Sequence, residues 1–160
     1  MRRKTGGYFK PGPTDPPPLT VSVNHRASFS EVDAMAVAWH GRYPRFFEMA
    51  HECLCRRIGL SYKDFFAAGV MAPIVQLHTD YYQSVFLDEA VTITITLFWT
   101  DAARLNAEYA VIKENGELAA AGYTVQMFTD GQTGEPFLVT PALLAACQEK
   151  WRRGDFKDLQ

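Results

Sequence analysis

A carboxylate and the start of a helix lie close together in the stretch SEVDAMAVAWHGRYPRFFEMAHECL, residues 30–54. Asp33 precedes an apolar run, and His40 and Gly41 follow that run where the helix is expected to begin. A carboxylate can act as a nucleophile or as a general base. The first turn of a helix presents backbone N–H groups without intrahelical partners and a partial positive charge, which together can stabilise an oxyanion. The stretch thus combines a group that can attack with groups that can stabilise the charge formed.

Each of these residues also has a plain structural interpretation. A single aspartate in a loop is often a cap or a turn residue. For His40 we favour the backbone N–H over the imidazole as the active group. Glu48 lies further along the same helix and is a second candidate carboxylate, although we favour a role as a structural partner for a nearby donor.

The helix that must position these groups is long and amphipathic. Pro44 lacks an N–H group and is comfortable only in the first helical turn, so the helix begins between His40 and Tyr43. Gly59 is a suitable end. Apolar side chains recur at helical spacing on one face: Tyr43, Phe46, Phe47, Ala50, Leu54 and Ile58.

The remaining elements are mostly strands. Alternating and β-branched patterns predict strands at residues 20–29, 73–86, 91–99, 104–112 and 118–128. Asn115-Gly116 predicts a tight hairpin between the last two. We expect the last four strands to form a meander and residues 141–156 to form a short helix. A five-stranded antiparallel sheet that curls around one long helix buries the apolar surface of both, so the predicted class is α+β.

Composition limits the classes of protein that fit. The chain has 160 residues, 48% of them hydrophobic, which suits one globular domain at residues 20–160. Residues 1–19 are rich in glycine and proline and are expected to form a flexible extension. A net charge of −2 argues against a nucleic-acid-binding protein. No apolar run reaches membrane-spanning length, and the basic N-terminus lacks the apolar region of a secretory signal.

The cysteines suit a reducing compartment. Cys53, Cys55 and Cys147 form a sparse, odd set without the spacing of a disulfide framework. Cys53 and Cys55 are two residues apart on a helix and point in different directions, so they make a poor metal pair. We therefore expect structural thiols, no metal site and a cytoplasmic location.

Three sequence blocks in order resemble a known family. They are Asp33 with Trp39-His40, Tyr43 and FFEMAHE; then DYYQSVFLDEAVTI; then LAAAGYTVQMFTDGQTGEP. Together they resemble hotdog-fold acyl-CoA thioesterases of the 4-hydroxybenzoyl-CoA thioesterase and YbgC-like group, over about residues 20–146. Three positions depart from that pattern. Ala-Met-Ala replaces the usual glycine region after Asp33, Ser84 replaces a proline, and His51 replaces an arginine.

The resemblance implies a function and a set of site residues. Asp33 would be the nucleophile or general base, and the amide at His40 would polarise the thioester carbonyl. Met35, Val37, Gly41 and Phe47 would contact the substrate, with Met35 narrowing the acyl pocket. The substrate would be an acyl-CoA or an acyl carrier protein thioester, and no cofactor is expected because coenzyme A is part of the substrate. A small sheet with an exposed edge strand tends to pair with another strand unless that edge is covered, so a homodimer or homotetramer is expected.

Two other functions remain open from the sequence. One is a non-catalytic acyl-binding protein, which would have no need of a carboxylate facing a carbonyl site. The other is a hydratase or dehydratase of the same fold, for which we would expect a histidine with a partner acid, and no such motif stands out.

Overall fold

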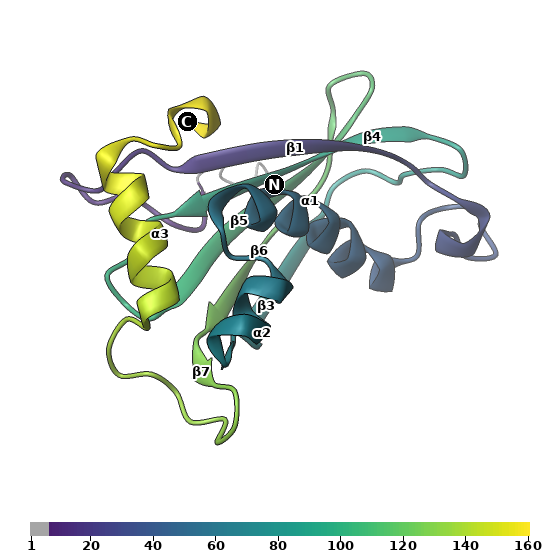
Figure 1. The fold of residues 1–160 in the computed structure, drawn as a ribbon. Coiled ribbons are helices and arrows are strands. Elements are labelled where there is room, and N and C mark those ends of the chain that lie inside the picture. The colour runs from purple at the N-terminus through teal and green to yellow at the C-terminus, as the bar shows by residue number, and fades with distance from the viewer. Residues whose placement is uncertain (1–6) are drawn as a thin grey trace.

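The fold is one sheet wrapped around one long helix (Figure 1). A computed structural model of the chain describes residues 7–160. The strands are β1 (Leu19–Arg26), β2 (Val70–Met71), β3 (Ile74–Tyr81), β4 (Ala90–Phe98), β5 (Arg104–Lys113), β6 (Leu118–Met127) and β7 (Thr129–Asp130). The α-helices are α1 (Tyr43–Ile58), α2 (Tyr62–Ala68) and α3 (Ala142–Arg153), with short 3₁₀ helices at Phe29–Glu31, His40–Arg42 and Lys157–Leu159.

The main sheet has five antiparallel strands in the order β1-β4-β5-β6-β3. The α+β class and the five-stranded sheet around a long helix are therefore confirmed. The expected meander of the last four strands is wrong for β3, which pairs with β6 and not with β4. The free edge of β4 is taken by β1, whose residues pair with it from Leu19↔Leu97 to Arg26↔Ala90. β1 and β3 thus form the two edges of the sheet.

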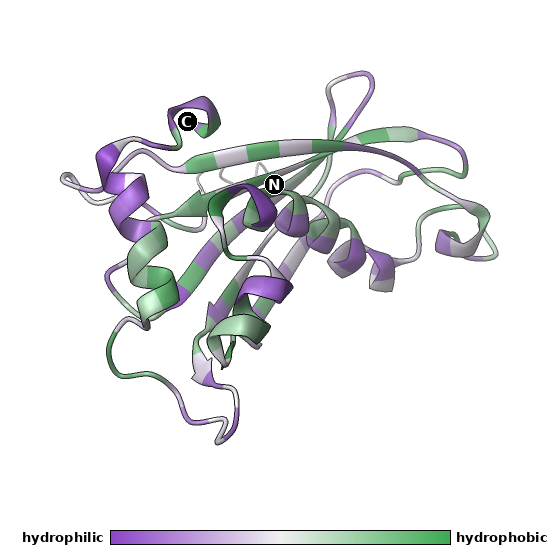
Figure 2. Cartoon of the chain, viewed as in Figure 1, coloured by the Kyte–Doolittle hydropathy of each residue, from purple (hydrophilic) through white to green (hydrophobic). Residues whose placement is uncertain are grey.

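The core lies between α1 and the concave face of the sheet. In β4 the residues Val91, Ile93, Ile95 and Leu97 are buried and the alternate threonines are partly exposed, as the alternation predicts. The same alternation appears as changing colours along the strands in Figure 2. Phe46, Ala50 and Leu54 of α1 are 0% exposed against this face. Burial of this apolar surface is the main stabilising contribution to the fold.

The ends of α1 lie where the sequence predicts. The 3₁₀ turn at His40–Arg42 leads directly into α1, and Pro44 lies in the first helical turn. Gly59 ends the helix in the left-handed conformation, with φ at 77°, and its N–H group donates to the Cys55 carbonyl. Glycine adopts this conformation without the steric cost that a Cβ brings.

Two features were not predicted from the sequence. The helix α2 lies where the sequence shows only a short polar and aromatic stretch, and Ser61 caps it by accepting from the Asp64 N–H group. The ribbon of β2 and β7 extends the structure below the main sheet. The strand expected at 73–86 is also shorter, because β3 ends at Tyr81.

Parts of the predicted extension contact the rest of the domain. Its first six residues lie outside the described part of the chain. Further on, the Phe9 N–H group donates to the Glu108 carboxylate at 2.5 Å, and the Tyr8 ring lies 5.0 Å from that of Tyr123. The Trp151 Nε1–H group donates to the Pro17 carbonyl at 2.9 Å. This segment therefore lies along the domain, without a helix or strand before Leu19 among the described residues. In the same part of the chain, no helix is long and apolar enough to span a membrane.

Candidate active site

Asp33 is the first residue of a tight turn, residues 33–36, between β1 and α1. Its N–H group donates to the Val37 carbonyl at 2.9 Å, and its carbonyl accepts from the Ala36 N–H group at 3.0 Å. Its side-chain Oδ1 accepts from the Met35 N–H group at 2.8 Å. The carboxylate is partly exposed. One carboxylate oxygen is thus fixed by the turn, which orients the group and leaves Oδ2 as the better placed oxygen for chemistry.

The turn places an alanine where a glycine would be unstrained. Ala36 has a φ of 58°, in the left-handed region that residues with a Cβ disfavour. It is held there because the Leu87 N–H group donates to its carbonyl at 2.9 Å, and Val37 forms a β-bridge with Phe86. Within the Ala-Met-Ala stretch that follows Asp33, Ala36 is therefore the residue at which glycine would relieve strain.

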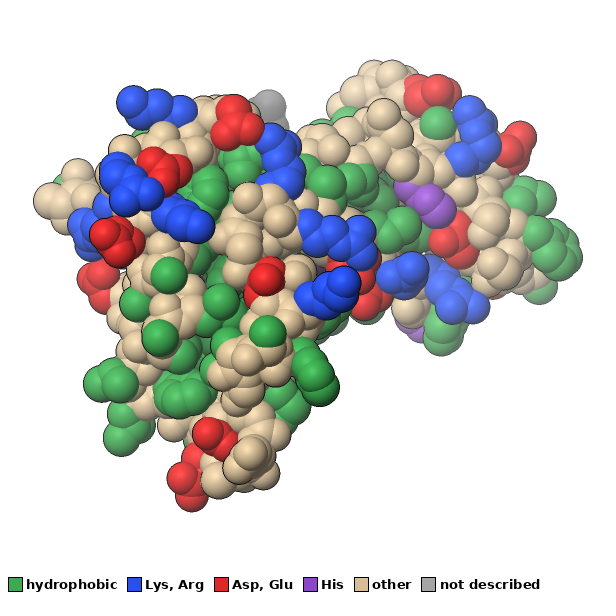
Figure 3. All heavy atoms as spheres, in the orientation of Figure 1, with side chains coloured by type: hydrophobic (Ala, Val, Ile, Leu, Met, Phe, Trp, Pro, Cys, Tyr) green, Lys and Arg blue, Asp and Glu red, His purple; other side chains and the backbone are tan. Residues whose placement is uncertain are grey.

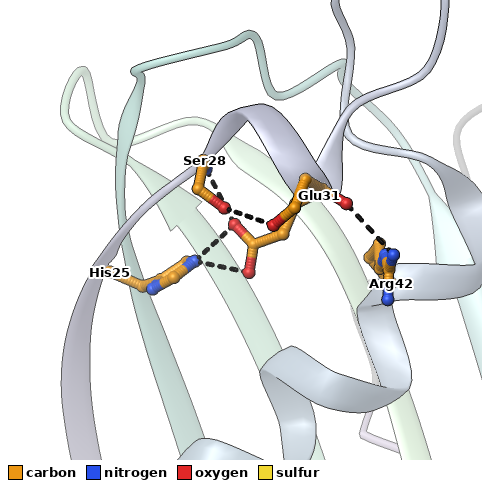
Figure 4. A network of polar contacts seen from close by, with 5 residues as sticks. His25, Ser28, Glu31 and Arg42 are labelled. Atoms are coloured by element: carbon orange, nitrogen blue, oxygen red, sulfur yellow. Dashed lines mark hydrogen bonds and ion pairs between the residues drawn. The ribbon is translucent and has the colours of Figure 1, made fainter.

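A polar network fixes the segment that leads into this turn (Figure 4). The Glu31 carboxylate accepts from the Ser28 N–H group at 2.8 Å, and His25 Nε2 of β1 lies 2.8 Å from it. Arg42, just before α1, donates to the Ser30 carbonyl at 3.0 Å. Burial raises the pKa of Glu31, but the hydrogen bonds from Ser28 and His25 lower it more, so its pKa lies below the usual value. The network joins β1, the Asp33 segment and the start of α1.

The same segment is joined to the start of α1 by hydrogen bonds and close packing. The Trp39 N–H group donates to the Glu31 carbonyl at 2.9 Å. The Tyr81 hydroxyl of β3 donates to the His40 carbonyl at 2.9 Å. A Cβ on Gly41 would clash with the Trp39 ring, so the glycine permits this close packing. Asp33 and the first N–H groups of the helix therefore belong to one short, multiply bonded unit.

The predicted acyl contacts divide into two groups. Met35 is 75% exposed at the tip of the turn, and Val37 is partly buried beside it. Phe47 is 2% exposed and stacks on Tyr109, with ring centroids 4.5 Å apart and planes at 12°. Phe47 also borders a small cavity on the flank of α1. Met35 and Val37 therefore lie in the same loop segment as Asp33, whereas Phe47 lies on α1, about one helical turn after its start, and is buried in the core.

Glu48 borders the same small cavity and pairs with Arg45. The distance from Arg45 Nη1 to the Glu48 carboxylate is 2.8 Å. The structure therefore supplies the nearby donor that the structural interpretation of Glu48 requires.

A buried polar chain beneath α1 was missed in the sequence. His51 Nδ1 lies 3.0 Å from the Tyr109 hydroxyl, which lies 3.1 Å from Thr124 Oγ1. His51 Nε2 lies 3.3 Å from Cys55 Sγ. Burial lowers the pKa of His51 to about 4, so the imidazole is neutral near pH 7. The position of His51 one residue after Ala50, on the buried side of the helix, was the available signal.

Comparison with known proteins decides the family. The model of the family described as the thioesterase-like superfamily matches residues 27–147. The chain belongs to this superfamily. Together with the five-stranded sheet around α1, the match confirms the predicted hotdog fold, and it identifies the protein as a thioester hydrolase. The 4-hydroxybenzoyl-CoA and YbgC-like subgroup is not resolved by this match.

Individual thioesterases support the same placement. The chain is 24% identical over 114 residues to a 1,4-dihydroxy-2-naphthoyl-CoA hydrolase of Thermosynechococcus vestitus, covering 71% of this chain and 77% of the relative. It is 20% identical to a putative acyl-CoA thioesterase, YneP, of Bacillus subtilis, covering 68% and 78%. Among solved structures, a DHNA-CoA thioesterase from Staphylococcus aureus superposes with a TM-score of 0.76 at 25% identity, covering 87% of this chain and 95% of that one.

Proposed function

We propose that the protein hydrolyses an acyl-CoA to a free acid and coenzyme A, with Asp33 as the catalytic carboxylate. The observation that carries this proposal is the short bonded unit that contains both Asp33 and the start of α1. Within it, a carboxylate that can attack lies in the same turn-to-helix segment as amides that can stabilise an oxyanion. The two relatives named as acting on CoA thioesters favour CoA as the carrier.

The reaction can proceed in two ways that need the same residue. As a general base, Asp33 accepts a proton from water, the hydroxide adds to the thioester carbonyl, and the C–S bond breaks as the thiolate leaves. As a nucleophile, Asp33 adds to the carbonyl itself and the C–S bond breaks as the coenzyme A thiolate leaves. Water then hydrolyses the acyl-aspartate anhydride to the free acid and restores the carboxylate. In both routes the negative charge that develops on the carbonyl oxygen is stabilised by the His40 and Gly41 amides at the helix start.

Exposed basic side chains lie along α1, from the proposed site at its start to beyond its far end, and suit the phosphates of coenzyme A. Figure 3 shows Lys and Arg side chains gathered over α1. Five exposed basic residues of this region are Arg42, Arg45, Arg56, Arg57 and Lys63. Guanidinium groups bind phosphate through paired N–H donors. Arg42 is the nearest of the five in sequence to the helix start, and we assign it to the carrier side of the site.

The functional unit we propose is a dimer formed through β3. Among the described residues this edge strand pairs only with β6, and its large apolar side chains are partly exposed: Ile74 is 54% exposed, Val75 48%, Leu77 45% and Tyr81 48%. An unpaired apolar edge is a site of association unless it is covered. Because Tyr81 also contacts the helix start, such a dimer would place the second protomer next to the proposed site.

The decisive experiment measures release of free thiol from a panel of acyl-CoAs by the wild type and by Asp33→Asn. We expect the wild type to hydrolyse at least one member and the variant to lose at least ~100-fold in kcat. Wild-type activity in a folded Asp33→Asn would show that another group, with Glu48 first, is the catalytic carboxylate.

A further inference from the structure

A cavity of about 260 Å³ lies between the second half of α1 and the helix α2. Its interior is bordered by apolar and aromatic side chains, chiefly Leu60, Tyr62 and Phe65. Arg56 and Lys63 also border it, and both are exposed. An engineered apolar cavity of roughly 150 Å³ holds a benzene molecule. The α1–α2 cavity is therefore large enough for a substantial apolar group.

The two buried polar side chains that face this cavity, His51 and Cys55, carry no charge at neutral pH, whereas the charged Glu52, Arg56 and Lys63 border it at more exposed positions. His51 borders it and is neutral there, since burial lowers its pKa to about 4. Cys55 also borders it, and burial raises the pKa of its thiol far above neutrality. The two groups lie within hydrogen-bond distance of each other. The buried part of the cavity therefore suits an uncharged, apolar group.

A second, smaller cavity lies between this space and the start of α1. It measures about 40 Å³ and shares two bordering residues, His51 and Tyr62, with the larger one. At its other end it reaches Pro44, in the first turn of α1 and four residues from His40. Tyr62 thus borders both the smaller cavity, toward the start of α1, and the larger α1–α2 cavity.

The two cavities follow one stripe of α1. Pro44, Glu48, His51 and Cys55 are spaced at i, i+4, i+7 and i+11, which places them on one flank of the helix. At 1.5 Å per residue this stripe is about 16 Å long. A flexible, unbranched chain fits this long path, because the smaller cavity of about 40 Å³ has much less room than the roughly 150 Å³ cavity that holds a benzene ring.

We propose that these two cavities form one channel for the acyl group, and that the substrates are thioesters of unbranched aliphatic acids of medium to long chain. This inference rests on the proposed function and adds the substrate class. The thioester would lie at the helix start, the first methylenes would pass Tyr62, and the end of the chain would occupy the α1–α2 cavity. Each buried methylene should raise kcat/KM by about fourfold until the cavity is filled.

The test compares kcat/KM for butanoyl-, octanoyl-, dodecanoyl- and hexadecanoyl-CoA with benzoyl-CoA and 1,4-dihydroxy-2-naphthoyl-CoA. The wild type should prefer dodecanoyl- or hexadecanoyl-CoA. Cys55→Met fills the far cavity and should lower kcat/KM for these two by at least ~10-fold, while butanoyl-CoA changes by less than about twofold. Cys53→Met is the matched control, because Cys53 points to another face of α1 and should leave the profile unchanged.

A second variant tests the channel independently, in case Cys55→Met folds poorly. Tyr62 is 52% exposed, so Tyr62→Ala carries little risk to the fold. Removal of this ring widens the passage and should raise kcat/KM for benzoyl-CoA by about 10-fold or more relative to octanoyl-CoA. A wild type that prefers an aromatic substrate, or a length profile that neither variant changes, would overturn the channel.

Calorimetric binding of sodium dodecanoate separates this inference from the proposed function. Dodecanoate should bind the wild type and Cys53→Met and bind Cys55→Met at least ~10-fold more weakly. Binding with this pattern, but without hydrolysis of any thioester, would refute the proposed function and leave the channel. Hydrolysis with equal dodecanoate binding by all three proteins would refute the channel and leave the proposed function.

Discussion

The Met35 N–H group donates a 2.8 Å hydrogen bond to Oδ1 of Asp33. The carboxylate proposed for catalysis is therefore also part of the turn that carries it. The structural role and the catalytic role of Asp33 can be separated by asparagine. The amide oxygen of asparagine can accept the Met35 hydrogen bond but cannot act as the base or nucleophile.

This difference separates three variants. Asp33→Asn should keep the melting temperature within a few degrees of the wild type and lower kcat by at least ~100-fold with little change in KM. Asp33→Ala should lose the same activity and also about 1 kcal/mol of stability, because the turn loses its acceptor. Glu48→Gln keeps the shape of the partner of Arg45 and should retain most of the activity. Steady-state kinetics and thermal unfolding measure both effects. A Glu48→Gln variant that loses as much kcat as Asp33→Asn would contradict the assignment of Asp33 as the sole catalytic carboxylate.

The left-handed Ala36 predicts an unusual response to glycine. Glycine normally lowers stability because it gives the unfolded chain more freedom, by about 0.4–1 kcal/mol. At Ala36 it also relieves the strain of a φ of 58°, which is worth roughly 1–2 kcal/mol. Ala36→Gly should therefore leave stability unchanged or raise it, whereas Ala34→Gly in the same exposed turn should lower it. Urea unfolding of both variants is the measurement, and equal losses would show that Ala36 is not strained.

The buried His51 predicts a pH dependence of stability. Its pKa is about 4 in the folded protein and about 6.5 when unfolded, so the unfolded chain binds the additional proton between these values. Above pH 6.5 His51 is neutral in both states and does not lower the free energy of unfolding. As the pH falls from 6.5 to 4, protonation of the unfolded chain lowers this free energy by about 3 kcal/mol in total. His51→Gln cannot titrate, so its free energy of unfolding should fall less steeply over this interval. Parallel pH profiles for the two proteins would contradict the burial of an uncharged imidazole.

The exposed edge strand predicts the effect of a charge on assembly. Leu77 is 45% exposed on β3, and Leu77→Lys should prevent association there and give a monomer by light scattering at micromolar concentration. Leu138→Lys makes the same substitution at a position that is 98% exposed and outside the sheet, so its mass should equal that of the wild type. A dimeric Leu77→Lys would place the interface elsewhere, and a monomeric wild type would exclude the dimer.

The sequence alone determined the parts of this protein that depend on local pattern. The order of Asp33, His40 and Tyr43, the apolar face of α1 and the alternation in β4 each lie within one segment, where the periodicity of the backbone decides which side chains are buried. The helix stop at Gly59 is equally local, because it depends on one left-handed residue. These features were sufficient to predict the fold class and the segment that contains the proposed catalytic residue.

Only the tertiary structure decided the features that join distant segments. A strand pattern does not specify its partner, and β3 pairs with β6 because β1 takes the edge of β4. The strain at Ala36 depends on the Leu87 segment that holds it, and the His51–Tyr109 contact joins residues that are 58 positions apart. The proposed channel along α1 depends on the position of α2 beside the second half of α1, because residues of both helices border the larger cavity. Substrate choice therefore follows from the packing between elements, which sequence periodicity does not encode.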